Sequence, residues 1–264
     1  MDFTEVNRQL EGAAEALSDH WKIQDNEQDR RTRFYRRYDT FSELIHSNEY
    51  AQLSEEDQNT TLHRWYNTKT SETCERIFVE YGAEAADYEQ NYFNKIDIFI
   101  HDVRFDVKIT NFPQNNEVRQ MRLDLKKRSD RDRLICWLYQ NQSREQRYDT
   151  GNRLFIVCKG GSVRESTRLK QSFDQIEVKV RAYMAYLEQT EYAFHTVSVP
   201  EVNGGETTVK SDILVILPES DDLKQRLADP CPACHSRRHL VVAKQGAYRG
   251  NMILKCNCDG FTNV

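Results

Sequence analysis

The chain has 264 residues, enough for one large domain or for one domain with appendages. Its hydrophobic fraction of 38% and charged fraction of 30% are polar for a globular protein, but well-placed apolar runs argue against disorder. Because the net charge is −5, overall charge does not predict nucleic-acid binding, and a polyanionic partner would need local basic patches or a metal.

Residues that direct a protein to a membrane or out of the cell are not visible. The N-terminal residues lack the basic and apolar regions of a signal peptide, and no apolar run approaches the length of a membrane span. A cytoplasmic protein with reduced thiols and no membrane contact is therefore expected.

Residues 1–69 are expected to form a helical region, because apolar residues recur at helical spacing and the chain has no proline before Pro113. Ser54 followed by three acids is typical of a helix start. One stretch interleaves arginines with aromatic residues, and its candidate nucleic-acid contacts are Arg33, Arg36 and Arg37. The alternative is a solvated helix face whose arginines pair with neighbouring acids.

A further helix is predicted over residues 70–82, with Ser71 as its cap and Gly82 as its end. The apolar residues at helical spacing that would form its buried stripe are Cys74, Ile77, Phe78 and Tyr81.

This helix carries three glutamates. A rotation of about 100° per residue puts Glu75 and Glu80 on the flanks of the buried stripe, whereas Glu72 points away from it. Glu75 is the preferred candidate for an acid that reaches into a cleft beside a sheet, ahead of Glu80 and Glu72. The alternative is that all three are surface charges.

Residues 95–110 form two runs of alternating apolar and polar residues, which is typical of a β-hairpin. If the hairpin closes through a two-residue loop at positions 101 and 102, Asp97 lies opposite Asp106 with Cβ atoms about 5 Å apart. Lys108 shares their face. Because two close carboxylates repel, two acids and a lysine around one point indicate a divalent metal and an activated water.

A second basic stretch, residues 119–133, follows the hairpin. Its candidate nucleic-acid contacts are Lys126, Lys127 and Arg128, and the alternative is again a solvated face. Beyond it, strands are expected at residues 153–158, 193–199 and 212–217, with one long helix at residues 163–190. That helix contains another acid-x-lysine, Glu177 and Lys179, but no acidic strand precedes it, so it is not the expected site.

Four C-terminal cysteines follow the pattern Cys-x2-Cys-x21-Cys-x-Cys, which resembles a zinc ribbon: Cys231, Cys234, Cys256 and Cys258. Short strands are expected between them at residues 240–244 and 252–255. Four thiolates closing a tetrahedral site would hold a structural zinc in a module of about 35 residues that is too small to build its own core. His235 or His239 could replace one ligand.

Asp97, a turn and then Asp106-Val-Lys, preceded by a helix with an acid, resemble the PD-(D/E)XK nuclease superfamily, which includes many restriction enzymes and repair nucleases. The resemblance spans roughly residues 70–160, although Ile96 stands where the family often has proline. It implies an α/β fold with a restriction-endonuclease-like core, in which a mixed sheet is flanked by helices. The core would occupy residues 70–225, after the helical region and before a zinc ribbon at residues 226–264.

The resemblance also implies roles for the hairpin residues. Asp97 and Asp106 would ligate Mg²⁺ or Mn²⁺ together with the Val107 carbonyl, because hard oxygen ligands suit these ions. Lys108 would orient or help deprotonate the attacking water, and Glu75 would complete the metal shell or position that water.

The implied function is that of a metal-dependent endonuclease that hydrolyses DNA, in a restriction or anti-phage defence setting, as a homodimer or with a partner protein. Two alternatives are a nuclease acting on RNA and a non-catalytic nucleic-acid-binding or assembly subunit that keeps the fold. In a further alternative, the hairpin acids and the lysine form ordinary ion pairs.

Overall fold

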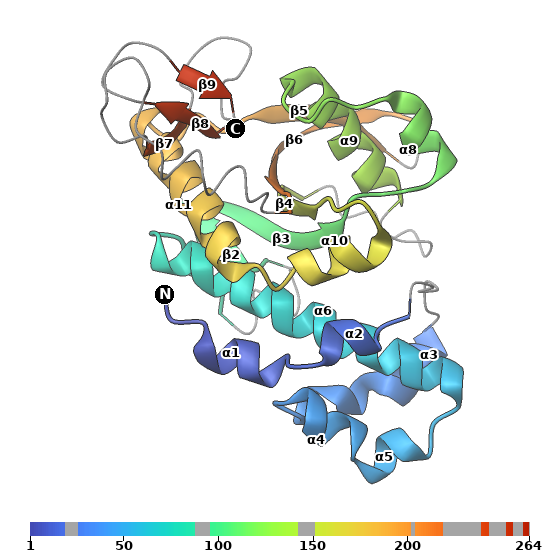
Figure 1. Ribbon diagram of the computed structural model, residues 1–264. Coiled ribbons are helices and arrows are strands. Elements are labelled where there is room, and N and C mark those ends of the chain that lie inside the picture. The colour runs from blue at the N-terminus through green and yellow to red at the C-terminus, as the bar shows by residue number, and fades with distance from the viewer. Residues whose placement is uncertain are drawn as a thin grey trace.

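The computed structural model describes residues 1–18, 26–87, 96–141, 151–201, 204–218, 239–242, 252–255 and 261–263. These residues form an α/β fold in which helices flank a six-stranded mixed sheet, with a smaller three-stranded sheet formed by the C-terminal residues (Figure 1). The expected α/β class, with a central mixed sheet flanked by helices, is therefore confirmed. None of the helices described is both long and apolar enough to cross a membrane.

The strands of the main sheet lie in the order β1-β2-β3-β4-β6-β5. Their bounds are β1 Glu84–Ala85, β2 Ile98–Ile100, β3 Val103–Asn111, β4 Arg153–Cys158, β5 Thr196–Pro200 and β6 Glu206–Ile216. β1, β2 and β3 pair antiparallel, whereas β3, β4 and β6 pair parallel. The three strands expected after the hairpin are present, and β6 is longer than expected because its first five residues pair with β5.

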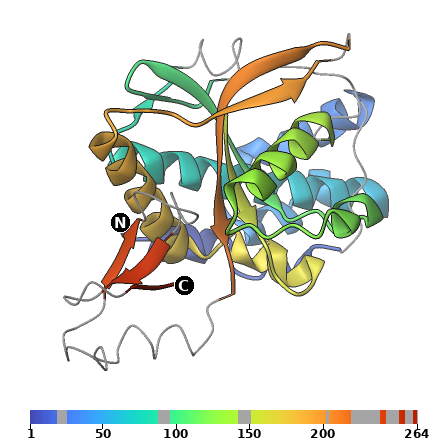
Figure 2. The ribbon, with the colours of Figure 1, turned by 90° about the horizontal axis from the view of Figure 1, so that it is seen from above.

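Helices cover both faces of this sheet. Their bounds are α1 Thr4–Gln9, α2 Ala13–Ala16, α3 Asn26–Thr32, the 3-10 helix η1 Arg33–Arg37, α4 Phe41–Ile45, α5 Asn48–Ala51, α6 Glu55–Glu80, α8 Asn116–Met121, α9 Arg128–Asn141, α10 Val163–Leu169 and α11 Phe173–Gln189. Figure 2 shows α11 and α9 on opposite sides of β6. Accordingly, buried side chains of α6 and α11 join one hydrophobic cluster with the sheet, and those of α9 join another.

The helix expected over residues 70–82 is only the second half of a longer helix, α6. Ser54 caps its start as predicted, with its hydroxyl oxygen accepting a backbone N–H at 3.2 Å, and Gly82 follows its end with a φ of 101°. Ser71 lies inside the helix and does not cap it. Two threonines near this point bond back to a carbonyl four residues earlier within the helix: Thr70 to Tyr66 at 2.9 Å and Thr73 to Lys69 at 2.8 Å. The expected boundary between residues 69 and 70 therefore falls within continuous helix.

The single helix expected over residues 163–190 is two helices, α10 and α11. Between them, the buried Lys170 donates to the Asn67 side chain of α6 at 2.7 Å, and Gln171 donates to the Leu10 carbonyl at 3.3 Å. These bonds to the N-terminal helices hold the chain in a turn, so the prediction of one continuous helix was wrong.

The C-terminal residues described form an antiparallel sheet in the order β7-β8-β9. Its strands are β7 His239–Val242, β8 Met252–Lys255 and β9 Phe261–Asn263. Strands are thus confirmed at both expected places, and β9 is an addition. The four cysteines of the predicted zinc site and His235 lie outside the described residues, as does the side chain of His239.

Candidate functional site

The hairpin of β2 and β3 closes through the predicted loop. His101 and Asp102 have φ angles of 46° and 62°, and positive φ at both loop residues is the conformation of a type I′ turn. The strands pair Ile98 with Phe105. This register brings residue 97 next to residue 106, as the two-residue loop predicts.

The two strands begin to separate at Asp97. Its N–H donates to the Phe105 carbonyl at 3.0 Å, while its carboxylate oxygen Oδ2 accepts the N–H of Val107 at 2.7 Å. A side-chain oxygen thus takes the place of a backbone partner where β2 leaves β3. The carboxyl of Asp97 is thereby fixed beside that of Asp106, with which it interacts.

Asp106 is only 9% exposed and is bound by a cation on each side. The ammonium of Lys108 forms an ion pair with its Oδ1, and Nε of Arg153 donates to its Oδ2 at 3.2 Å. Lys108 shares the face of Asp106 because they are two residues apart on β3, and Arg153 is its neighbour across the β3–β4 ladder. The buried carboxylate therefore has its charge compensated from two strands.

The protonation states of Asp97 and Lys108 depend on their burial and on the charges around them. Burial raises the pKa of Asp97 to about 8, and the charges of Glu75 and Asp106 act in the same direction against the attraction of Lys108. Burial alone would lower the pKa of Lys108, but Asp106 and Asp97 outweigh it and raise this pKa above its usual value. At neutral pH the site therefore holds an ammonium at Lys108 and a protonated carboxyl at Asp97.

Of the three glutamates on the second half of α6, Glu75 is the one that joins these charges. Burial raises the pKa of Glu75, Lys108 opposes this rise and Asp106 adds to it, so all three groups are close enough to interact. Glu72 and Glu80 are exposed. The structure therefore brings together the four residues predicted to be catalytic: Glu75, Asp97, Asp106 and Lys108.

The donors of this group decide whether it fits a metal ion. Among the residues that the structure describes, no group of three or more histidine, cysteine, aspartate or glutamate side chains is arranged to hold a metal ion. At the hairpin, the ammonium of Lys108 occupies Oδ1 of Asp106. A positive group thus already occupies one of the carboxyl oxygens predicted to bind a cation, and these hard oxygens suit Mg²⁺ or Mn²⁺ once deprotonated.

The predicted nucleic-acid contacts differ in how they are engaged. The exposed ones are Arg33, Arg36 and Arg37 on η1 and Lys126 and Lys127 before α9. Arg37 pairs with Glu49 at 2.8 Å, as the solvated-face alternative expects. Arg128 forms a partly buried ion pair with Asp212 at 2.6 Å, so a phosphate would have to displace that carboxylate.

Part of η1 packs beside the stretch of α6 that precedes Glu75. Glu72 lies one turn before Glu75 on α6. Burial raises the pKa of Glu72, and the charge of Arg36 acts against this rise, so these two groups are close enough to interact. The hydroxyl of Tyr35 on η1 lies 3.1 Å from that of Thr68 on the same helix. The first basic stretch is therefore packed beside the part of α6 that carries Glu75.

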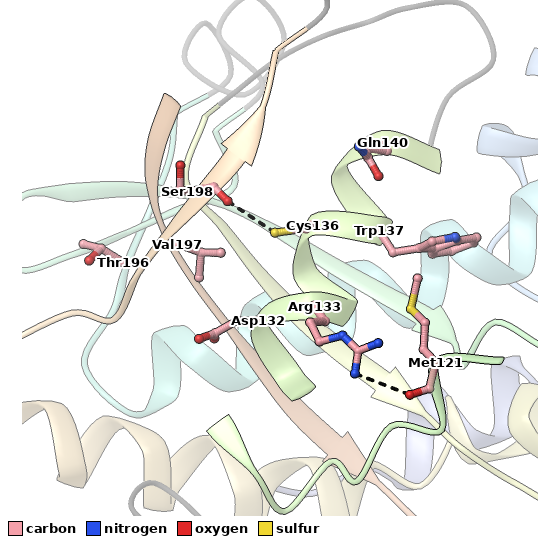
Figure 3. Close-up of a pocket in the computed structure, with 9 residues that line it drawn as sticks. All are labelled: Met121, Asp132, Arg133, Cys136, Trp137, Gln140, Thr196, Val197 and Ser198. Atoms are coloured by element: carbon pink, nitrogen blue, oxygen red, sulfur yellow. Dashed lines mark hydrogen bonds between the residues drawn. The ribbon is translucent and has the colours of Figure 1, made fainter. Parts of the chain in front are cut away.

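A pocket between α9 and β5 lies away from these residues (Figure 3). It is lined by Met121, Asp132, Arg133, Cys136, Trp137, Gln140, Thr196, Val197 and Ser198. The thiol of Cys136 donates to the Ser198 carbonyl at 3.3 Å, and burial raises its pKa, so it is not an activated nucleophile. None of the four predicted catalytic residues lines this pocket.

Comparison with known proteins assigns no family, because no family model, curated protein or solved structure matches the chain.

Sequence reasoning missed Arg153. Its only signal is an arginine at the first position of an otherwise apolar strand, and its partner Asp106 lies 47 residues earlier. The pairing of these two residues emerges only from the parallel ladder of β3 and β4.

Proposed function

We propose that this protein is a metal-dependent endonuclease that hydrolyses phosphodiester bonds of DNA. The observation that carries the proposal is the meeting of Asp97, Asp106 and Lys108 where β2 and β3 separate. The element order also supports a restriction-endonuclease-like core, because α6, the hairpin and α9 precede β4, which pairs parallel to β3. This is the helix–hairpin–helix–strand order of the PD-(D/E)XK resemblance.

In this proposal, Asp97 and Asp106 hold Mg²⁺ or Mn²⁺ with help from the Val107 carbonyl and Glu75. A bound divalent cation would stabilise negative charge on the phosphate and favour hydroxide over water. To serve as a ligand, Asp97 has to give up the proton that burial preserves. Likewise, Oδ1 of Asp106 becomes accessible only when Lys108 leaves it.

Once released, Lys108 lies next to the reacting phosphate. Asp106 and Asp97 raise its pKa only while Lys108 is paired with them, so release removes that effect. A released Lys108 would either donate hydrogen bonds to the attacking water or to a phosphate oxygen, or help to deprotonate that water.

Exposed basic side chains support contact with a phosphate backbone, whereas the choice of DNA and the biological setting depend on the family resemblance. Exposed Arg33, Arg36 and Arg37 on η1, together with Lys126 and Lys127, would contact the phosphate backbone. Arg36 is close enough to interact with Glu72, one turn before Glu75. The choice of DNA, a role in restriction or anti-phage defence, and a homodimer or partner protein come from the family resemblance alone.

The direct test incubates supercoiled plasmid DNA, and separately RNA, with the full chain and Mg²⁺, Mn²⁺ or EDTA. The wild type is expected to cleave DNA with either metal and not with EDTA. Asp106→Asn and Lys108→Met should each reduce the rate by about 100-fold or more, because they remove a cation ligand and the charge facing the phosphate. Lys179→Met is the matched control, since it removes the lysine of the other acid-x-lysine, which lies on α11.

DNA cleavage that persists in both site variants would refute the assignment of this site. Cleavage of RNA and not DNA would make the protein a ribonuclease. Binding of nucleic acid without cleavage would instead favour the non-catalytic alternative, which agrees with the Lys108–Asp106 ion pair as an ordinary structural contact.

A further inference from the structure

Two cationic side chains bind Asp106, and they differ in how far they are exposed to solvent. The side chain of Lys108 is 40% exposed, whereas that of Arg153 is 11% exposed. Lys108 can therefore turn towards solvent, while Arg153 has no such route without opening the core. If a divalent cation enters, the oxygen vacated is Oδ1, and Oδ2 stays bound.

The guanidinium of Arg153 is fixed on its other side by an aromatic ring. Its carbon Cζ lies 4.9 Å from the ring centroid of Tyr139, which is within the range of a cation–π contact. The Tyr139 hydroxyl donates to the Gly151 carbonyl at 2.8 Å, and its ring packs edge-on against Phe155 with centroids 5.7 Å apart. Arg153 is thus held between a tethered ring and the carboxylate.

The backbones of Asp106 and Arg153 are also fixed to each other. The N–H of Asp106 donates to the Asn152 carbonyl at 3.0 Å. The Asn152 side chain then donates to the Arg104 carbonyl at 3.1 Å and accepts the N–H of Lys210 at 2.8 Å. Three strands therefore meet around the residue that precedes Arg153, which leaves little freedom between the arginine and its carboxylate.

We infer that Arg153 is a positioning residue that holds Oδ2 of Asp106 and so presents Oδ1 to a divalent cation. The guanidinium is held by the Tyr139 ring and donates to Oδ2 from a fixed direction, which the more exposed, flexible ammonium of Lys108 does not. The inference rests on the proposed function, because it assigns Arg153 to the same cation site.

The test measures Mn²⁺ binding by titration calorimetry on the full chain, without substrate. Arg153→Met is expected to weaken Mn²⁺ binding by about 10- to 100-fold, the usual effect of removing a group that orients a ligand. Arg153→Lys keeps the charge without the planar contact, so it should recover part of the affinity. Asp106→Asn supplies the baseline for Mn²⁺ bound elsewhere on the chain.

Arg131→Met is the matched control, because Arg131 is also a buried arginine but its charged neighbours are Asp212, Arg128 and Asp132. It should lower the melting temperature and leave Mn²⁺ affinity unchanged. Thermal unfolding of each variant identifies any that fails to fold. If Arg153→Met is such a case, Arg153→Lys decides, and wild-type affinity in it would overturn the inference.

The failures can be told apart. Wild-type affinity in a folded Arg153→Met overturns the role of Arg153 alone. Mn²⁺ binding that depends on Arg153 in a protein that cleaves nothing refutes the nuclease and supports the inference. A wild type that binds no more Mn²⁺ than Asp106→Asn overturns both.

Discussion

Asp97 carries the most unusual charge state of the site, because its fold-dependent pKa of about 8 is far above the ordinary value of 3.8. A raised carboxyl pKa means that the folded state binds the proton more tightly than the unfolded state does. The stability associated with this proton is fully present below the unfolded pKa. It is lost as pH rises towards the folded pKa, so the relevant window runs from about pH 4 to pH 8.

Asp97→Asn imitates the protonated carboxyl and should remove this pH dependence. We expect the variant to match the wild type in free energy of unfolding near pH 4 and to exceed it by about 1–3 kcal/mol near pH 9, a value reduced because Asp97 remains partly exposed. Urea unfolding across this pH range measures the difference. A difference that does not change with pH would contradict the assigned proton.

Asp130 provides a control of opposite sign. It accepts the Asp124 N–H at 2.9 Å, and this bond lowers the pKa of Asp130. Its contribution is therefore present above the unfolded pKa and is lost as pH falls, so Asp130→Asn should cost stability at neutral pH and not in acid.

Some residues of the site could be predicted from the sequence, and others could not. Asp97, Asp106 and Lys108 lie within twelve consecutive residues, and strand periodicity together with a two-residue hairpin loop places them on one face. Glu75 could be preferred because helical rotation puts it on a flank of the buried stripe. The contact of Arg153 with Asp106 depends on which strand pairs with β3, and no local pattern encodes that choice.

Among the secondary-structure elements, the hairpin turn carries residues that are not the most favourable for its backbone conformation. His101 and Asp102 both adopt positive φ, a conformation that glycine adopts without strain and that costs free energy at other residues, although less at aspartate and histidine than at most. The ring of His101 stacks on Tyr192 with centroids 4.2 Å apart, which gives position 101 a packing role. Asp102 is exposed, so its side chain can be changed with few other consequences.

Asp102→Gly is therefore expected to stabilise the protein by about 0.5–1 kcal/mol, because glycine adopts this backbone conformation without strain. Asp102→Ala, which has a Cβ and no polar group, should destabilise it. Chemical unfolding of both variants checks the prediction, and equal stabilities would indicate that the turn does not limit folding.

Helix ends were less predictable than the hairpin because tertiary contacts decide them. The pattern of residues 163–190 is helical throughout, yet the bonds of Lys170 and Gln171 to other helices interrupt it. Conversely, Ser71 is a plausible cap by composition, but α6 continues through it because its apolar stripe is buried on both sides. The buried strand β4 was predictable to the residue, since an arginine and five apolar residues are followed, after Lys159, by paired glycines.

At the scale of the whole molecule, we expect the C-terminal cysteines to bind a structural zinc ion that is separate from the hairpin site. We expect about one zinc ion per chain, bound by the four cysteines around β7 and β8, because four thiolates favour a closed tetrahedral site. Elemental analysis of purified protein measures it, and Cys231→Ser or Cys256→Ser should lower the zinc content.

Cys136→Ser is the matched control for these variants, because Cys136 is a partly buried cysteine on α9 and donates to the Ser198 carbonyl. It should retain zinc. A wild type without zinc, or equal loss in Cys136→Ser, would contradict the predicted zinc site.

The continuity of α6 has one more consequence. Thr68 contacts η1, and Glu75 follows about two turns later on the same helix. The regular turns of α6 therefore fix the direction of the Glu75 side chain relative to the arginines of η1. One residue inserted between them would rotate Glu75 by about 100° around the axis, whereas seven would preserve its direction and move it by about 10 Å. Evolution can lengthen this stretch only in whole turns if the two groups act on one substrate.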